Sequence, residues 1–180
     1  MMHRLAVLML AFFPLAALAE VYPALHDVTG VAADDVLNIR ESPDAGSAII
    51  GTLAPDAQGV EVVGVTGDWA VVNTPEATGY ASLRFLARQP GPDWSEVDRP
   101  LHCLGTEPFW DLAIVPETRT AWLTTPEQSE PEALAMGQVW PALPWSPVAA
   151  FAIPDGFVAL SPVDCSDGMS DRRYGIAVDI

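Results

Sequence analysis

The stretch Val36-Leu37-Asn38-Ile39-Arg40-Glu41-Ser42-Pro43 gives the strongest structural signal in this chain of 180 residues. Across Val36 to Arg40 the residues alternate between inward and outward positions, which is typical of a strand with one buried face. The following Ser42-Pro43-Asp44-Ala45-Gly46 combines residues that favour tight turns. The stretch therefore predicts a short strand that ends in a turn.

Similar short strands are predicted on either side of this stretch, over residues 24–88. Residues 49–53, 60–65 and 69–72 are rich in β-branched or aromatic side chains, and Thr66-Gly67-Asp68 has hairpin-turn chemistry. A further strand is expected near residues 79–86. This pattern predicts a small all-β barrel.

The same segment resembles the bacterial SH3 (SH3b) domain. The resemblance rests on Leu-Asn-Ile-Arg at 37–40, Ile-Gly-Thr-Leu at 50–53, Gly-Asp-Trp at 67–69 and Gly-Tyr-Ala-Ser-x-x-Phe-Leu at 79–86. The family usually has tryptophan in place of Tyr80. The resemblance implies an SH3-like barrel that binds cell-wall peptides or protein partners and rarely catalyses a reaction.

Four residues of this barrel are candidate binding residues: Asn38, Arg40, Trp69 and Tyr80. Aromatic rings supply a large contact area at a small entropic cost, so Trp69 and Tyr80 could form a platform for a ligand. Both rings could equally pack in the core or at its rim. Asn38 and Arg40 could line a groove, or could satisfy backbone groups and pair with nearby acids.

The first nineteen residues have the pattern of a secretory signal peptide. His3-Arg4 precede an apolar run from Leu5 to Leu18, and Ala17-Leu18-Ala19 fits a cleavage site. The run is shorter than the roughly 18 residues that a membrane-spanning helix needs. We therefore expect a periplasmic or secreted protein that starts near Glu20 and has no transmembrane segment.

The chain is strongly acidic. It contains 24 Asp and Glu but only 8 Lys and Arg, and its formal net charge is −16 at pH 7. A surface of this sign repels polyanions at long range. The charge therefore argues against nucleic-acid binding as the main role, and the sequence leaves the oligomeric state open.

Two prolines and a glycine in Arg88-Gln89-Pro90-Gly91-Pro92-Asp93 predict a linker. We expect a signal peptide at 1–19, the SH3-like domain at 20–88, a linker at 89–99 and a second domain at 100–180. Alternating apolar residues predict strands in this second domain, which we interpret as a compact β barrel or sandwich. Residues 130–136 could form a short helix.

The chain has two cysteines, Cys103 and Cys165, and both lie in the second domain. In an exported protein, such a pair is expected to form one disulfide. Each cysteine opens a distinctive segment, Cys103-Leu-Gly-Thr-Glu-Pro-Phe-Trp110 and Cys165-Ser-Asp-Gly-Met-Ser-Asp-Arg-Arg-Tyr174. Together the two segments resemble a family of uncharacterised bacterial periplasmic proteins and lipoproteins.

A disulfide would bring the two segments together, and the candidate binding residues there are Glu107, Trp110, Asp167, Asp171 and Arg172. Three carboxylates beside an arginine could bind a cation, a basic peptide group or a polar ligand, or could supply an acid and a base. Alternatively, they could form a network that caps turns. Their spacing does not fit a calcium loop, no histidine pair supports zinc, and no cofactor is expected.

The segment Trp140-Pro-Ala-Leu-Pro-Trp-Ser-Pro147 has a proline at every third position, as in a polyproline II helix. It could bind the aromatic surface of this chain's own SH3-like domain. It could also be a rigid loop that covers an edge strand.

The sequence leads to two main hypotheses on function. The first is an exported, non-enzymatic cell-envelope binding protein that recognises a cell-wall peptide or an envelope protein. The alternative is a small envelope hydrolase or modifying enzyme that uses Glu107, Asp167 and Asp171. A purely structural envelope protein is a third possibility.

Overall fold

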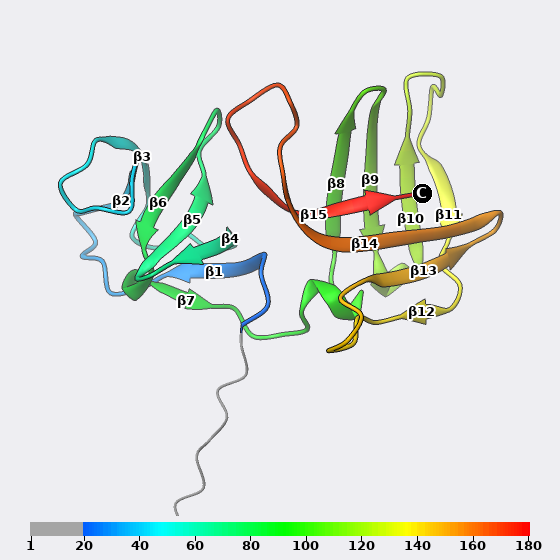
Figure 1. The fold of residues 1–180 in the computed structure, drawn as a ribbon, viewed down its shortest axis with the longest axis horizontal. Coiled ribbons are helices and arrows are strands. Elements are labelled where there is room, and N and C mark those ends of the chain that lie inside the picture. Colours follow the sequence, from blue (N-terminus) through cyan, green and yellow to red (C-terminus); the bar gives the residue numbers. More distant parts are fainter. Residues whose placement is uncertain (1–19) are drawn as a thin grey trace, which may run out of the picture.

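The computed structural model describes residues 20–180, and these form two β units joined by a short linker (Figure 1). The predicted signal peptide lies outside the described residues. Every extended sheet is antiparallel, and only three short 3-10 turns interrupt the strands in the described part of the chain. The prediction of an all-β protein is confirmed.

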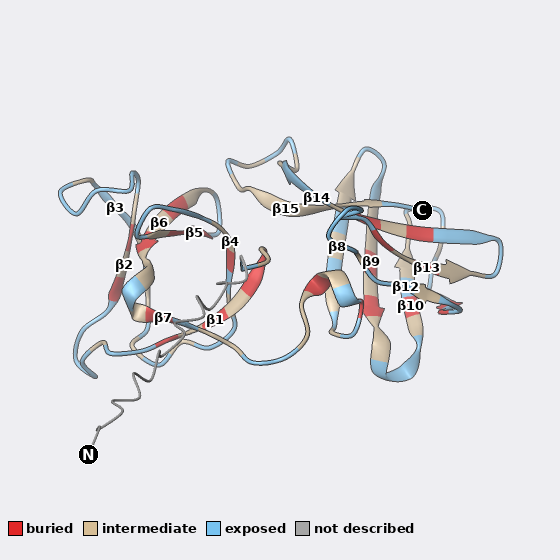
Figure 2. Ribbon diagram, turned by 60° about the horizontal axis from the view of Figure 1, so that its bottom comes forward, coloured by how far each residue is buried: buried red, intermediate tan, exposed pale blue. Residues whose placement is uncertain are grey.

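The first unit is one seven-stranded sheet. Its strands follow the order β3-β2-β6-β5-β4-β1-β7, and Figure 2 shows that the sheet curls around its buried residues. The strands are β1 (Ala24–Val28), β2 (Leu37–Arg40), β3 (Ile49–Leu53), β4 (Val60–Thr66), β5 (Trp69–Asn73), β6 (Thr78–Ser82) and β7 (Leu86–Arg88), with a 3-10 turn at Leu83–Phe85. This arrangement is consistent with the SH3-like barrel that the sequence predicts.

Alternation along the strands explains the core of this unit. Leu37 and Ile39 of β2 are buried, whereas Asn38 and Arg40 point to the other face. Gly79 of β6 allows a close approach, since a Cβ atom there would lie 2.5 Å from Ile39 Cγ2 and 2.9 Å from the Arg40 carbonyl oxygen. The Gly-Tyr-Ala-Ser segment therefore needs glycine at its first position.

The second unit consists of two four-stranded sheets that pack against each other with crossing strands (Figure 1). The first sheet contains β8 (Leu101–Thr106), β9 (Phe109–Val115), β10 (Thr120–Thr124) and β11 (Glu132–Ala135). The second contains β12 (Val139–Trp140), β13 (Ala149–Ile153), β14 (Gly156–Cys165) and β15 (Tyr174–Asp179). Leu112 and Ile114 from one sheet meet Phe151 and Leu160 from the other in a single core, as in a β sandwich.

Two local expectations differ from the structure. The predicted helix at 130–136 is wrong, because residues 132–135 form β11, which pairs with β10 and buries Leu134. The predicted linker is also more than a spacer. Its 3-10 turn at Trp94–Glu96 places Trp94 and Val97 in the core of the second unit.

The proline-rich segment forms a tight turn rather than a continuous polyproline II helix. Leu143 and Ser146 exchange two backbone hydrogen bonds, and the Ala142 amide donates to the Ser95 carbonyl oxygen at 2.9 Å. Trp145 lies in the turn and is 80% exposed. Among residues 20–180, no helix has the length and apolar character that a membrane crossing requires.

Candidate functional site

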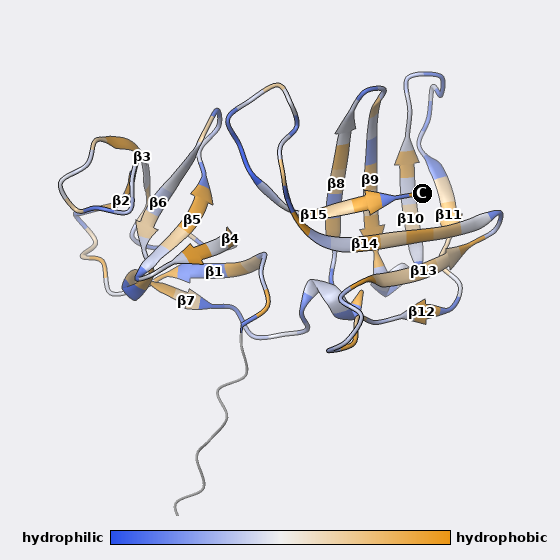
Figure 3. Ribbon diagram, in the orientation of Figure 1, coloured by the Kyte–Doolittle hydropathy of each residue, from blue (hydrophilic) through white to orange (hydrophobic). Residues whose placement is uncertain are grey.

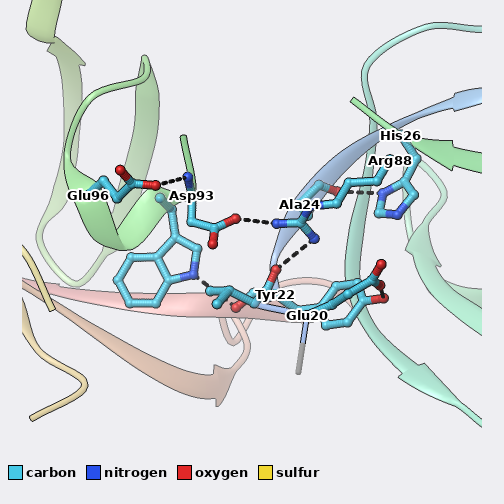
Figure 4. Close-up of polar contacts among 9 residues, drawn as sticks. Glu20, Tyr22, Ala24, His26, Arg88, Asp93 and Glu96 are labelled. Atoms are coloured by element: carbon cyan, nitrogen blue, oxygen red, sulfur yellow. Dashed lines mark hydrogen bonds and ion pairs between the residues drawn. The ribbon is translucent and has the colours of Figure 1, made fainter. Parts of the chain in front are cut away.

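The chain entering β1 and the linker leaving β7 are tied together where the two units meet (Figure 4). Arg88 donates to the Val21 carbonyl oxygen at 3.0 Å and forms an ion pair with Asp93. The Trp94 indole N–H donates to the Tyr22 carbonyl oxygen at 2.9 Å. These contacts fix one side of the junction through buried or half-buried groups.

The loop between β14 and β15, residues 166–173, makes the other side of the junction. It is hydrophilic (Figure 3) and reaches toward β5 and β6 of the first unit (Figure 1). Asp171 forms a parallel bridge with Ala77. The Asp171 amide donates to the Glu76 carbonyl oxygen, and the Asp171 carbonyl oxygen accepts from the Thr78 amide, both at 3.0 Å. The backbone of Asp171 therefore docks the loop on the barrel.

Asn73 strengthens this docking with its side-chain amide. Its Nδ2 donates to the Arg173 carbonyl oxygen at 2.8 Å, and its Oδ1 accepts from the Arg173 amide at 3.2 Å and from the Thr78 hydroxyl at 2.8 Å. The side chain thus pairs with a backbone peptide 100 residues away in the sequence, much as a neighbouring strand would.

Asp167 organises the same loop from within. Its carboxylate accepts from the amides of Met169 and Ser170, from the Ser170 hydroxyl and from the Tyr174 hydroxyl. These hydrogen bonds, led by that from the Met169 amide, lower the pKa of Asp167 to about 2. This network caps the turn of the loop, which is one of the roles that the sequence left open for Asp167.

Thr106 connects the two distinctive segments of the second unit. Its hydroxyl donates to the Asp167 carbonyl oxygen at 2.8 Å. Glu107 follows in the β8–β9 turn and is exposed. Asp167 lines a cavity that is described below, but neither Glu107 nor Asp171 belongs to the wall of that cavity. The structure therefore brings the two segments together, but it does not gather the three carboxylates around one point.

Trp110 lies directly over Gly105 in the β8–β9 hairpin. The two residues are cross-strand partners, and a Cβ atom on Gly105 would lie 2.1 Å from Trp110 Nε1. Only glycine at position 105 leaves room for the indole to cover the backbone. Packing therefore explains why this segment has Gly105 opposite Trp110. The indole also lines the cavity described next.

A partly open cavity of about 540 Å³ lies between the two units. Its volume falls within the range of roughly 300–1,000 Å³ that small-molecule sites occupy. Apolar wall residues come from the β1 end, the linker, β8 and β15, and include Trp94, Leu101 and Ile176. Both units therefore contribute residues to its wall.

Four charged side chains line the cavity: Glu61, Asp167, Arg99 and Arg172. The carboxylate of Asp167 is already hydrogen-bonded within its own loop. Burial raises the pKa of Glu61 above its usual range, and the charges of Arg172 and then Arg99 oppose this effect. The side chain of Glu61 is nevertheless exposed, because it faces the open cavity while protein atoms lie on its other sides. The three ion pairs found within residues 20–180 involve other residues, so Glu61 meets neither arginine directly.

Arg172 has unused hydrogen-bonding capacity. Within residues 20–180 its Nε is buried without a hydrogen-bond partner, and its guanidinium lies over the Tyr174 ring at 5.4 Å from the ring centre. A buried donor that has no acceptor costs about 1–3 kcal/mol.

Cys103 and Cys165 both line the cavity, but they are free thiols, so the predicted disulfide is wrong. Cys103 lies in β8 and Cys165 in β14, on separate sheets, and the Cys165 sulfur is 3.7 Å from the Tyr174 carbonyl oxygen. Export of the protein and an even number of cysteines do not show that the two Cβ atoms lie close enough for a disulfide. Burial raises the pKa of Cys103 to about 12, so its thiol stays protonated at neutral pH.

The four predicted residues of the barrel share its outer face. Arg40 pairs with Tyr80 across β2 and β6, and Tyr80 pairs with Val71 of β5. Cross-strand partners, and residues two apart in a strand, point to the same side, which adds Asn38 and Trp69 to this face. Arg40 also donates to the Ser47 carbonyl oxygen at 2.7 Å, so part of its role is structural.

Sequence reasoning missed Asn73, Glu61 and Arg99. Asn73 directly follows the strand predicted at 69–72, and Glu61 lies within the one predicted at 60–65 as an ordinary outward residue. Arg99 follows the linker, where its surroundings depend on the second unit. Nothing local distinguishes these residues, because their roles come from contacts between the units.

Comparison with known proteins agrees with the first unit. A family model described as the bacterial SH3 domain matches residues 35–87, which span β2 to β6 and most of β7. No curated protein and no solved structure matches the chain. The match does not extend to the second unit, for which the resemblance to uncharacterised periplasmic proteins gains no support. Residues 35–87 of this chain form a bacterial SH3 domain.

Proposed function

We propose that this protein is an exported, non-enzymatic binding protein of the bacterial cell envelope. Its SH3 domain would hold a cell-wall peptide or an envelope protein partner. The observation that carries the proposal is the family match at residues 35–87, because such domains often bind cell-wall peptides or proteins. Localisation to the periplasm or the exterior is part of the same proposal.

The outer face of the domain offers suitable chemistry for a peptide. Arg40 and Tyr80 are cross-strand neighbours, and Ile49 lies opposite Arg40 on β3 with 54% of its surface exposed. Because β3 is an edge of the sheet, its free backbone groups can pair with an extended peptide. A charged group, an aromatic ring and an apolar side chain thus lie beside an open edge.

The test is a titration with soluble muropeptides, followed by NMR amide shifts. We expect shifts on β2, β3 and β6, and weaker binding of about fivefold or more for Trp69→Ala and Tyr80→Ala, since truncated contact residues at an interface centre cost over 1 kcal/mol. Trp122→Ala is the matched control, because Trp122 is an exposed tryptophan on β10 of the second unit. If saturating muropeptide and an envelope extract both left the face unshifted, the proposal would be refuted.

The alternative of a hydrolase has less support. With its pKa near 2, Asp167 is ionised at neutral pH and cannot act as a general acid there. Its carboxylate is already engaged by the loop. Loss of any detected turnover on wall fragments in Glu107→Gln or Asp171→Asn would instead favour the enzyme.

A further inference from the structure

The cavity between the two units carries an inference that is independent of the proposed peptide site on the outer face. Of the arginines in this lysine-free chain, Arg99 and Arg172 line this one cavity together with Glu61. The protein is acidic overall, but at this cavity two carboxylates, those of Glu61 and the loop-bonded Asp167, are matched by a pair of guanidinium groups. Such a pair favours an anionic group in the ligand.

Several other arginine side chains already have polar partners. Arg88 pairs with Asp93, Arg173 pairs with Asp164, and Arg119 donates to two carbonyl oxygens. Arg172 differs because, in the part of the chain that the structure describes, its guanidinium forms no ion pair and its buried Nε has no acceptor. A carboxylate in the cavity would supply an acceptor of the planar geometry that a guanidinium matches best.

Glu61 adds the opposite charge on the wall contributed by β4. It pairs with Leu25 in the sheet register and belongs to the face that looks away from the barrel core. Because it makes no ion pair within the described residues, it is open to an ammonium group in the cavity.

We propose that this cavity binds a zwitterionic ligand, a free amino acid or a short peptide with both termini free, with its carboxylate on Arg172 and its ammonium group on Glu61. Arg99 adds a second positive charge near the carboxylate. Apolar walls that include Trp94, Trp110 and Leu101 fit an aliphatic or aromatic side chain of the ligand. The volume of about 540 Å³ suits a molecule of this size.

The test uses the full mature chain and calorimetric titration with dileucine, with its C-amidated form and with its N-acetylated form. The unmodified dipeptide is expected to bind, and each capped form to bind about ten- to a hundredfold more weakly, because a charge-assisted hydrogen bond is lost. The indole N–H signals of Trp94 and Trp110 should shift in the NMR spectrum on binding. Absence of both heat and indole shifts with dileucine, dialanine and diphenylalanine at millimolar concentration overturns the proposal.

Two variants assign the contacts. Arg172→Gln should bind the free peptide more weakly and lose most of its preference over the amidated form, since Arg99 keeps one positive charge nearby. Glu61→Gln should no longer distinguish the free from the acetylated peptide. Arg173→Gln is the matched control, since its guanidinium pairs with Asp164 and not with the cavity. Arg172→Lys, which keeps the charge, covers the case in which the glutamine variant fails to fold.

The outcome separates this site from the outer face of the SH3 domain. If Trp69→Ala or Tyr80→Ala abolishes dipeptide binding while Arg172→Gln and Glu61→Gln do not, the peptide binds on the outer face and the cavity proposal fails. If only the cavity variants lose binding, the cavity site stands whatever the muropeptide titration gives.

Discussion

Asn73→Ala is expected to undock the loop 166–173 from the SH3 domain while leaving both cores folded. The substitution removes the two hydrogen bonds that join Asn73 to the backbone of Arg173 and a third from Thr78. Docking also holds Asp171 against β6 and Arg172 in the cavity wall. A loss of docking therefore disturbs the cavity as well as the contact between the units.

The magnitude follows from these three hydrogen bonds. Each contributes about 0.5–1.5 kcal/mol net, so the sum is roughly 1.5–4.5 kcal/mol. The side chain is only half-buried, and water can replace part of the loss, which places the expected effect near 2 kcal/mol at the low end of that range. Since about 1.4 kcal/mol is a factor of ten, the loop should open roughly thirtyfold more often.

Amide hydrogen exchange measures this opening directly. The Thr78 amide donates to the Asp171 carbonyl oxygen and the Asp171 amide donates to the Glu76 carbonyl oxygen, so both should exchange roughly thirtyfold faster in the variant. Amides in the core strands β4 and β5 should keep their rates. Asn38→Ala is the matched control, because Asn38 is the other asparagine of the chain and lies on β2, away from the loop. Unchanged exchange at Thr78 and Asp171 would refute the reasoning.

Two further predictions concern single residues of the second unit. Gly105→Ala should destabilise the protein by about 1–3 kcal/mol and shift the fluorescence of Trp110, because the indole must move away from the new Cβ atom. Gly156→Ala is the control, because a Cβ atom at Gly156 would meet nothing within 4 Å. Equal melting temperatures for the two variants would contradict the packing argument. The stabilising effect of Asp167 should be complete above its ordinary pKa of 3.8 and be lost as the pH falls through about 2, because its folded pKa is lowered. An acid titration followed by the Tyr174 NMR signals should show this transition near pH 2 and lose it in Asp167→Asn, whereas a midpoint near pH 4 would show that the network does not hold the carboxylate.

Much of the SH3 domain could be predicted from local patterns. Alternation in Leu37–Arg40 predicted β2, and the turn at Thr66-Gly67-Asp68 predicted the β4–β5 hairpin. These features depend on neighbours in the sequence and on which face of a strand is buried. The helix expected at 130–136 failed because the hydrogen bonds and the buried position of Leu134 in β11 outweigh the local preference of that segment.

The two distinctive segments show the limit of the same approach for the site. Their contact through Thr106 and Asp167 agrees with the expectation that they lie together. The basis of that expectation was wrong, because Cys103 and Cys165 are free thiols and hydrogen bonds make the contact instead. Residue types and spacing indicate chemical capacity, but they do not give the direction of a side chain.

The sequence by itself determined the all-β class, the position of the SH3 domain and the acidic surface, because strand alternation, turn chemistry and net charge depend on local order and composition. Only the tertiary structure decided that Asn73 would hold the loop and that Glu61, Arg99 and Arg172 would face one cavity. These residues are distant in the sequence and belong to different units. They come together only because of the way in which the two separately packed cores are joined. No local pattern in the sequence records how the two cores are oriented.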